Sequence, residues 1–403
     1  MNMNDLSKQP QIIYTGSVKN IFSGKNDETL YFKFTDRYSI FDWGEMPDLI
    51  FEKGCALNMM GYAFFKHLEN PQTWMDLKFK LMGSHFDSHF LNQLWESEVY
   101  KELVVSGLNH HCLGLSNNDY VKLPNLQKTT MMEVKKINVL KPTQSSEGYD
   151  YDVYQSRPQG CLLPLEVMFR FGLPTGNSLS KRFLEDTEYL KQYGFTELPD
   201  GNKMLNIPLV DFSTKLEKGD RYLTFENARK IAGLSEGEFN ELKTLTILVG
   251  LCLFTLHKDC GLELWDGKIE WAFGGENQNL KTSNSSNVNR RKFMLVDSIG
   301  LDEMRLSFNG AKLSKDFLRN VYKQTKWYEY LEKSKRESQE NGFDFKVICK
   351  EKYNAVPEKL NSHVLNQVSA LYKSYTNSIL KVMNFSQVFE SHYDLEFYRK
   401  SFL

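Results

Sequence analysis

The sequence predicts an α+β fold with more than one domain. Short runs in which apolar and polar residues alternate indicate β-strands. Longer runs with apolar residues every three or four positions indicate amphipathic helices. Both patterns occur along the whole chain, and its 403 residues are enough for two or three domains with a substantial core.

The composition is that of an ordinary soluble protein, with 41% apolar and 25% charged residues and a net charge of -1. This balance argues against nucleic acid as a partner. Residues 1–10 lack the apolar core of a signal peptide, and the most apolar run, 245–256, is too short to span a bilayer. The six cysteines are scattered without close pairs, which favours reduced thiols in the cytoplasm.

The first lobe is expected to cover residues 1–139 and to begin with β-structure. Two short strands joined by a turn of small residues are predicted within 12–22, and alternation predicts a strand at 30–35. A dense polar loop follows. A helix is expected from Lys53 to about Leu68, because its apolar positions fall on one face. The strand at 133–140 closes the lobe.

The second lobe is expected to cover residues 140–403, starting with a polar surface insertion at 142–159. A buried strand from 162 carries Glu166 and Arg170, which share a face because side chains alternate along a strand. Buried charges are costly unless they are paired or bound to a ligand, so an ion pair and a ligand site both remain open here. The following elements are a polar loop at 208–220, a helix capped by Thr224 and a long buried helix at 237–258.

The stretch 262–305 is predicted to form a hairpin followed by a further strand. Asp266-Gly267 between alternating apolar runs is a strong hairpin signal. Glu263 on the hairpin and Asp297 at the end of the next strand could together hold Mg²⁺, which prefers oxygen ligands and substrate phosphates. The alternative is that both carboxylates are solvated turn residues.

The last third of the chain is predicted to be mainly helical. Residues 274–291 are rich in Asn, Ser and Gly and are expected to form a flexible loop. Residues 313–340 are expected to be helical and highly charged. A final helix is predicted to begin near Pro357, because an apolar stripe with helical spacing follows it.

Seven short motifs follow one another in a fixed order along the chain. They are Gly-x-x-Lys at 16–19, Asp-Arg-x-Ser-x-Phe-Asp at 36–42, Lys-Gly-x-x-x-Asn at 53–58, Pro-x-Glu-x-x-x-Arg at 164–170, Ser-Thr-Lys-x-Glu at 213–217, Asp-x-x-x-Glu at 259–263 and Asp-x-x-x-x-Asp-x-x-Arg at 297–305. In this order they resemble the phosphoribosylaminoimidazole-succinocarboxamide synthases, or SAICAR synthetases. The resemblance covers nearly the whole chain.

The resemblance implies an ATP-dependent amide ligase of purine biosynthesis. In this family ATP phosphorylates the carboxylate of carboxyaminoimidazole ribonucleotide, and the amine of L-aspartate then displaces phosphate, without a protein nucleophile. The implied fold has two α+β lobes with an ATP-binding cleft between them, followed by C-terminal helices. ATP is the implied co-substrate and Mg²⁺ the cofactor, because several anionic groups must be brought together. The partners would be small molecules and no membrane, with a homo-oligomer as a compatible assembly.

The resemblance also suggests a role for each motif residue. It assigns ATP binding to Lys19, Val134, Lys135 and Lys136; Mg²⁺ binding to Glu263 and Asp297; substrate binding to Ser39, Asp42, Arg170, Ser178 and Arg305; and catalysis to Lys215, Asp259 and Asp302.

The chain departs from the family pattern at five positions. Ser17 and Gly261 stand where the family has lysine, Trp265 where it has glycine and Ser298 where it has glutamate, and Asn177 is an extra residue before Ser178. Lost cations and a lost carboxylate would affect the triphosphate and metal region. Two alternatives therefore stay open: a related ligase for another carboxylate or amine, and a nucleotide-binding protein without turnover.

Overall fold

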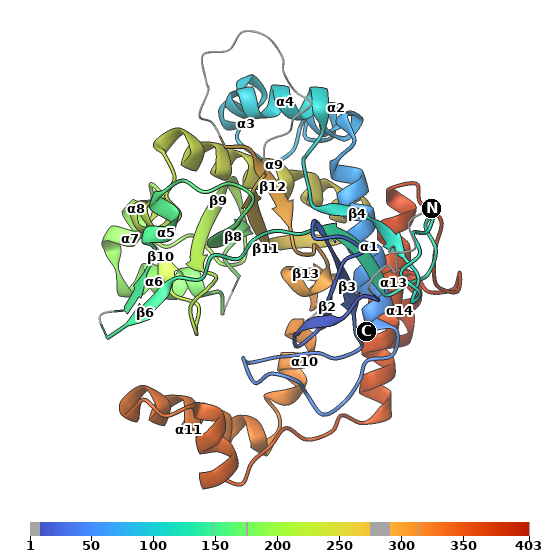
Figure 1. Cartoon of the computed structure of the whole chain (residues 1–403), viewed down its shortest axis with the longest axis vertical. Coiled ribbons are helices and arrows are strands. Elements are labelled where there is room, and N and C mark those ends of the chain that lie inside the picture. Colours follow the sequence, from blue (N-terminus) through green and yellow to red (C-terminus); the bar gives the residue numbers. More distant parts are fainter. Residues whose placement is uncertain (1–8, 147, 175, 275–290, 314, 403) are drawn as a thin grey trace, which may run out of the picture. The chain divides into compact units, whose positions relative to one another are not determined.

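The computed structural model describes residues 9–146, 148–174, 176–274, 291–313 and 315–402 (Figure 1). The chain divides into two units, and neither is continuous in sequence. The first comprises 1–62, 113–134 and 300–403, and the second 63–112 and 135–299. The predicted continuous lobes, 1–139 and 140–403, differ from this division. Local sequence patterns could not show that distant segments return to the same unit.

The first unit contains a five-stranded sheet in the order β1-β2-β3-β5-β4. The predicted hairpin is confirmed, with Thr15 opposite Asn20 across the turn. The strand expected at 133–140 begins earlier and ends at Lys135. The five strands are β1 (Ile12–Thr15), β2 (Lys19–Ser23), β3 (Thr29–Phe34), β4 (Cys112–Ser116) and β5 (Met131–Lys135).

The polar loop at 36–42 supports the start of helix α1 (Lys53–Leu68), which has its predicted bounds. The Asp36 carboxylate accepts a hydrogen bond from the backbone N–H of Gly54 at 2.9 Å. Such a bond satisfies one of the donors that a helix start leaves without an intrahelical partner. A Cβ at Gly54 would lie 2.8 Å from the Phe34 carbonyl oxygen, so the helix can approach β3 only with glycine there.

The C-terminal part of the first unit is largely helical, as predicted, but its boundaries differ. The last long helix begins at Ser362 instead of near Pro357, because the Asn361 side chain accepts a hydrogen bond from the Val364 N–H and caps it there. The elements are η1 (Leu301–Glu303), β13 (Met304–Phe308), β14 (Ala311–Lys312), α10 (Lys315–Tyr322), α11 (Lys326–Asn341), α12 (Phe345–Val347), η2 (Ile348–Lys352), α13 (Ser362–Val382) and α14 (Leu395–Phe402).

The second unit is built on an antiparallel sheet with strands in the order β10-β9-β8-β11, and β12 also pairs with β11. The predicted buried strand from residue 162 is confirmed as β8. The loop predicted at 208–220 is wrong for its first half, because residues up to Thr214 belong to β9. The strands are β8 (Leu162–Gly172), β9 (Met204–Thr214), β10 (Tyr222–Leu223), β11 (Glu263–Phe273) and β12 (Phe293–Val296).

Strand β11 is continuous, so the hairpin predicted at Asp266-Gly267 is wrong. Gly267 lies opposite Phe169 of β8, and a Cβ at this position would overlap the Phe169 ring. The same ring packs against Gly250, where an added Cβ would lie 2.9 Å from it. The glycine therefore serves close packing within a strand and not a turn.

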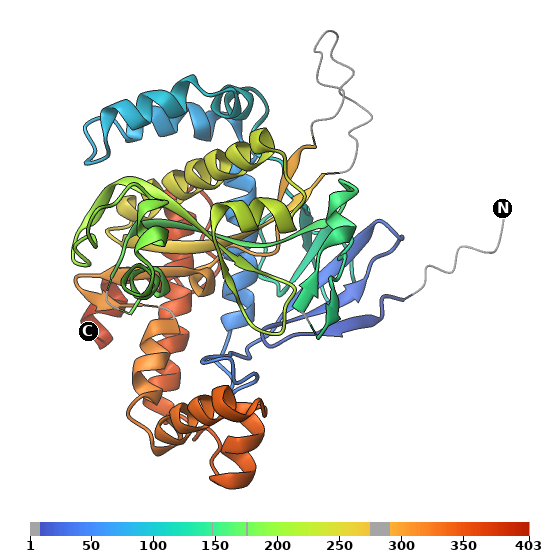
Figure 2. The ribbon, with the colours of Figure 1, turned by 90° about the vertical axis from the view of Figure 1, so that its left-hand side faces the viewer.

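Helix α9 (Glu236–Asp259) covers one face of this sheet (Figures 1 and 2). Among the described residues it is the one helix long and apolar enough to cross a membrane, yet 67% of its apolar window is buried. Its Ser235–Glu238 capping box fixes the first turn. The helix is therefore the core helix that the sequence predicted.

The remaining elements of the second unit surround this core. The insertion at 142–159 contains a small hairpin and a short helix, and the loop predicted at 274–291 lies almost entirely outside the described residues. The elements are α2 (Pro71–Lys80), α3 (Ser88–Glu96), α4 (Glu98–Ser106), β6 (Thr143–Ser145), β7 (Gly148–Asp150), α5 (Asp152–Gln155), α6 (Ser178–Glu185), α7 (Thr187–Lys191) and α8 (Phe225–Ile231).

Replacing Gly267 with alanine is expected to lower the free energy of unfolding by about 1–3 kcal/mol, because the new methyl group overpacks the Phe169 ring. Urea unfolding measures this change. In the control Gly237→Ala, on α9, nothing lies near the new methyl group, so stability should stay the same or rise slightly. Combining Gly267→Ala with Phe169→Leu should cost less than the sum of the single changes; strict additivity would contradict this explanation.

Candidate active site

The face of the sheet opposite helix α9 carries charged and polar side chains from three strands. Glu166 of β8 lies opposite Ser213 of β9 on one side and opposite Glu270 of β11 on the other. Residues directly opposite one another in antiparallel strands point to the same face, and so do alternate residues along each strand. The residues of this polar face are Glu166, Met168 and Arg170 of β8, Asp211 and Ser213 of β9, and Asp266, Lys268 and Glu270 of β11.

Two lysines hold the two glutamates of the polar face. The Lys215 ammonium lies 3.1 Å from Glu166 and 2.7 Å from Glu270, and the Lys268 ammonium lies 2.7 Å from Glu166. Both glutamates are buried, whereas the Lys215 and Lys268 side chains are 27% and 38% exposed. The lysines are thus the part of this network that an anionic ligand can reach.

The charges of the network keep it ionised. Burial alone would raise the pKa of Glu166, but Lys268 and Lys215 hold the pKa of this carboxyl below its usual range. Burial would likewise lower the pKa of Lys215, and the charges of Glu270 and Glu166 raise this pKa above that of a free lysine. Both ammonium groups therefore remain cationic at neutral pH.

A second cluster on the same face surrounds Arg170, whose side chain is 4% exposed. Its guanidinium lies 2.7 Å from Asp211 and 3.3 Å from Asp266, and it donates a hydrogen bond to the Ser178 hydroxyl at 3.3 Å. Ser178 begins α6, and the extra residue Asn177 caps this helix by accepting from the N–H groups of Leu179 and Ser180. The structure thus brings the predicted residues Arg170 and Ser178 together, and it gives Asn177 a structural role.

Asp211 is the centre of this cluster and was not predicted from the sequence. It is fully buried and also accepts hydrogen bonds from Arg182 at 2.5 Å and from the hydroxyls of Tyr189 and Tyr193. Burial would raise the pKa of Asp211, but Arg170 and Arg182 hold it below its usual range. Asp211 fell within a predicted loop, so its strand face could not be inferred.

The predicted metal pair of Glu263 and Asp297 is contradicted by the strand register. Val296, the residue before Asp297, lies opposite Glu270, whereas Glu263 is at the far end of β11. The strand from Glu263 to Glu270 spans about 23 Å. Of these two glutamates of β11, Glu270 is therefore the one that the register places nearer to Asp297.

Asp297 itself has an unusual backbone conformation, with φ at 65°. Its carbonyl oxygen accepts a hydrogen bond from His111 Nε2 at 2.9 Å. A left-handed conformation in a residue other than glycine stores strain and is common at functional sites. The described residues contain no group of three or more His, Cys, Asp or Glu side chains that could hold a metal ion. Glu270 and Asp297 are two carboxylates that could take part in holding one here.

The motif that was assigned to 259–263 occurs instead at 266–270. Asp259 is the last residue of α9, and its carboxylate pairs with Lys80 at 2.8 Å. The pattern Asp-x-Lys-x-Glu is complete at Asp266, Lys268 and Glu270 on the polar face. Asp259, Gly261 and Trp265 therefore lie outside this motif, and Ala272 is the residue at the position of the family's glycine. The spacing was visible in the sequence, but the hairpin interpretation of Asp266-Gly267 hid it.

Asp302, also predicted to be catalytic, has a structural position within the first unit. Its side chain is 1% exposed, pairs with Lys53 at 2.8 Å and accepts a hydrogen bond from the Tyr372 hydroxyl. Burial would raise the pKa of Asp302, but Lys315 and Lys53 lower it. These contacts tie the start of α1 to α13. We infer a structural role for Asp302 in place of the catalytic one.

The other predicted residues of the first unit lie on its sheet and loops. The Lys19 ammonium lies 4.4 Å from the centre of the Phe32 ring, and Arg305 pairs with Asp316 at 3.2 Å. Ser39 is partly exposed, and the Asp42 side chain is 90% exposed. Val134 is buried in β5.

Lys135 and Lys136, assigned to the second unit, are exposed at the end of β5 and just after it. Two sets of roles stay predictions: ATP binding by Lys19, Val134, Lys135 and Lys136, and substrate binding by Ser39, Asp42 and Arg305.

A sheet face on which partly exposed lysines are paired with buried carboxylates is suited to anionic ligands. Comparison with known proteins agrees with this kind of site. The family model for SAICAR synthetase matches residues 12–141 and 154–334. The chain belongs to the SAICAR synthetase family.

Individual relatives support the same assignment. A protein of Archaeoglobus fulgidus, provisionally named phosphoribosylaminoimidazole-succinocarboxamide synthase, is 32% identical over 86% of this chain and 87% of its own length. The enzyme of that name from Bacillus subtilis is 22% identical over 80% of this chain and 93% of its own length. The solved structure of Saccharomyces cerevisiae SAICAR synthase complexed with SAICAR has 18% identity and a TM-score of 0.55, covering 96% of this chain and 98% of its own. That similarity shows a shared fold.

Replacing Asp211 with asparagine is expected to lower the free energy of unfolding at pH 7 by about 3–5 kcal/mol, because two buried guanidinium groups lose their carboxylate. The pKa of Asp211 is lowered in the folded state. Its stabilising effect is therefore complete above the ordinary carboxyl pKa near 3.9 and is lost as the pH falls through the lowered pKa.

Urea unfolding from pH 7 to pH 3 measures this effect. The difference between wild type and Asp211→Asn should be constant down to about pH 5 and shrink below about pH 4. The control Asp259→Asn removes a half-exposed ion pair and should cost less than about 1 kcal/mol. Equal costs for the two variants would contradict the central role of Asp211.

Proposed function

We propose that this protein is an ATP-dependent ligase that joins the carboxylate of carboxyaminoimidazole ribonucleotide to the amine of L-aspartate, forming SAICAR in purine biosynthesis. Family membership supports the reaction type. The observation that carries the proposal is the lysine–glutamate network of Lys215, Lys268, Glu166 and Glu270, which holds cations ready on a rigid sheet. Fixed cations stabilise the phosphate charge that develops in such a reaction.

The proposed reaction has two steps. First, a carboxylate oxygen of the ribonucleotide forms a bond to the γ-phosphorus of ATP, and the bond from this phosphorus to the β–γ bridging oxygen breaks, releasing ADP. Next, the aspartate nitrogen attacks the acyl carbon, and the bond from this carbon to the phosphate oxygen breaks. The nitrogen loses a proton and phosphate departs with the electron pair. No protein nucleophile takes part.

In this scheme the exposed ends of Lys215 and Lys268 bind and orient the phosphate being transferred. Glu166 and Glu270 position the two ammonium groups, because each lysine is fixed by a buried carboxylate. Ser178 and Arg170 are proposed to bind the ribonucleotide, and the substrate-binding role of Arg305 stays a prediction. Asp211 would then act through Arg170 by holding its guanidinium.

Glu270 and Asp297 fit a Mg²⁺ ion that accompanies the nucleotide. Both are carboxylates, and Asp297 directly follows Val296, the residue that lies opposite Glu270. Two protein carboxylates completed by phosphate oxygens and water are a common donor set for Mg²⁺. When bound, the ion would neutralise phosphate charge. The free thiols of all six cysteines support the proposal of a cytoplasmic protein, and a homo-oligomer stays a prediction.

The purified chain, incubated with ATP, MgCl₂, carboxyaminoimidazole ribonucleotide and L-aspartate, is expected to release ADP and form SAICAR. Coupled ADP detection and mass spectrometry of the product measure this reaction. Omitting either the ribonucleotide or aspartate provides the control. ADP release only with another amine or another carboxylate would select a related ligase. Nucleotide binding without any release under all these conditions would contradict an enzymatic role.

Replacing Glu270 with glutamine should lower kcat by about 100-fold or more and raise the Mg²⁺ concentration needed for half-maximal rate, because one proposed metal ligand and one partner of Lys215 lose their charge. Titration of the rate with MgCl₂ measures both quantities. Glu263→Gln is the matched control on the same strand, and it should leave both unchanged. A larger effect of Glu263→Gln than of Glu270→Gln would restore the rejected metal pair.

A further inference from the structure

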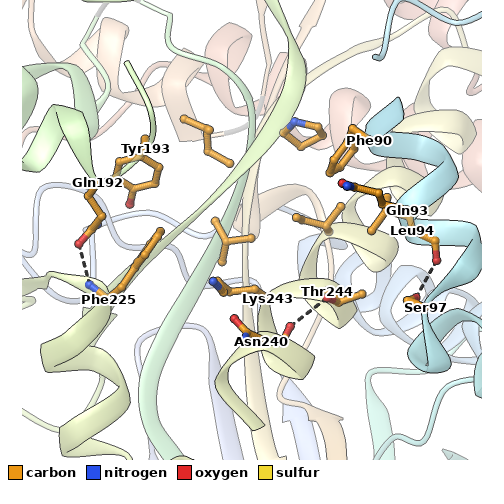
Figure 3. A pocket seen from close by; sticks show the side chains of 14 residues that line it. Phe90, Gln93, Leu94, Ser97, Gln192, Tyr193, Phe225, Asn240, Lys243 and Thr244 are labelled. Atoms are coloured by element: carbon orange, nitrogen blue, oxygen red, sulfur yellow. Dashed lines mark hydrogen bonds between the residues drawn. The ribbon is translucent and has the colours of Figure 1, made fainter. Parts of the chain in front are cut away.

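A cavity of about 470 Å³ lies beside the outer edge of strand β9, within the second unit. Its size is that of a small-molecule site. Its walls come from the α3–α4 corner, the β9 edge, the segment after α7, the start of α8 and one stripe of α9 (Figure 3). The stripe consists of Asn240, Lys243, Thr244 and Ile247, whose spacing places them on one side of the helix.

Lys243 is the charged residue of this wall. It is partly buried, and its ammonium lies 5.0 Å from the centre of the Phe225 ring and 5.1 Å from that of Phe239. Within the part of the chain that the structure describes, it has no carboxylate at ion-pair distance. Burial lowers the pKa of Lys243, and the charge of Glu236 offsets part of this effect. A desolvated cation of this kind favours an anionic ligand.

Several other polar groups of the wall already have partners inside the protein, although the buried Gln192 Nε2 has none among the described residues. Ser97 and Thr244 donate to the backbone carbonyls of Leu94 and Asn240, and the Gln192 side chain accepts from the Phe225 N–H. The rest of the lining is mostly apolar or aromatic, including Phe90, Leu94, Tyr193 and Phe225, with Gln93 and Asn240 as further polar residues. The wall therefore offers ring faces and aliphatic surface with one cation, which suits a flat apolar group bearing a single negative charge.

An extended peptide fits this edge less well. Pro208 has no N–H, so the edge of β9 lacks one donor that an added strand needs. Strand β10 already covers Phe212 and Ser213, and the carbonyl of Asn206 accepts from the Asp87 N–H. The open stretch is short, and a compact ligand matches it better than a strand does.

We propose that this cavity binds a small aromatic carboxylate, with its ring between the α3–α4 wall and the Tyr193–Phe225 wall and its carboxylate paired with Lys243. The cavity adjoins the Arg170 cluster, because the Tyr193 hydroxyl donates to Asp211 at 3.3 Å. A bound ring would therefore contact a residue that holds the partner of Arg170. The proposal is independent of the proposed ligase reaction.

Isothermal titration calorimetry of the full chain with 2-naphthoate tests the proposal, with the uncharged 2-naphthamide as the matched probe. The carboxylate is expected to bind at least about tenfold more tightly than the amide, since hydrogen bonds to charged groups contribute this much. Lys243→Met should weaken binding of the carboxylate by about tenfold or more and leave binding of the amide nearly unchanged.

Two further variants keep the test specific. Ile247→Trp fills the cavity and should abolish binding of both probes, whereas Lys258→Met, an exposed lysine near the end of the same helix, should change nothing. Circular dichroism checks that each variant is folded. The proposal is overturned if 2-naphthoate gives no binding heat at millimolar concentration, if Lys243→Met binds it as tightly as wild type, or if the amide binds equally well.

Discussion

The pairing of two lysines with two buried glutamates on one sheet face is the interaction on which the proposed site depends. Burying the carboxylates of Glu166 and Glu270 costs desolvation free energy. The attraction to the charges of Lys215 and Lys268 offsets this cost. A pairing of this kind contributes little net stability compared with an apolar face. Its value is that cations are fixed in place before a substrate arrives, so little reorganisation is needed when phosphate charge develops.

The opposite face of the same sheet explains how the network is held rigid. Phe169 packs between Gly250 of α9 and Gly267 of β11, which brings helix and strands into close contact. Because side chains alternate along β8, each apolar residue directed at α9 is followed by one directed at the polar face. The packing of one face thus fixes the spacing of the charges on the other.

Part of this arrangement could be predicted from the sequence and part could not. Strand β8, with Glu166 and Arg170 on one face, followed from its pattern, and the caps Thr224 and Ser235 match ordinary helix starts. The sequence could not favour Glu270, the proposed metal ligand, over Glu263, because that choice depends on strand register, which is a long-range property. Asp211 could not be identified from the sequence, because the polar residues of β9 that line the site have the composition of a loop. The burial of Asp302 could not be inferred, because Tyr372 lies far away in the sequence.

The position of the Asp-x-Lys-x-Glu motif at 266–270 means that the chain departs less from the family pattern than the sequence analysis suggested. Lys268 supplies the lysine of the Asp-x-Lys-x-Glu motif. Of the two lysines of the family pattern, only the one replaced by Ser17 is therefore absent.

Anomalous diffraction from crystals grown with MnCl₂ and a non-hydrolysable ATP analogue tests the central claim most directly. We expect a manganese peak bound by the Glu270 carboxylate on the polar face of the sheet. A peak at Glu263, or a bound nucleotide whose metal does not touch Glu270, would contradict it.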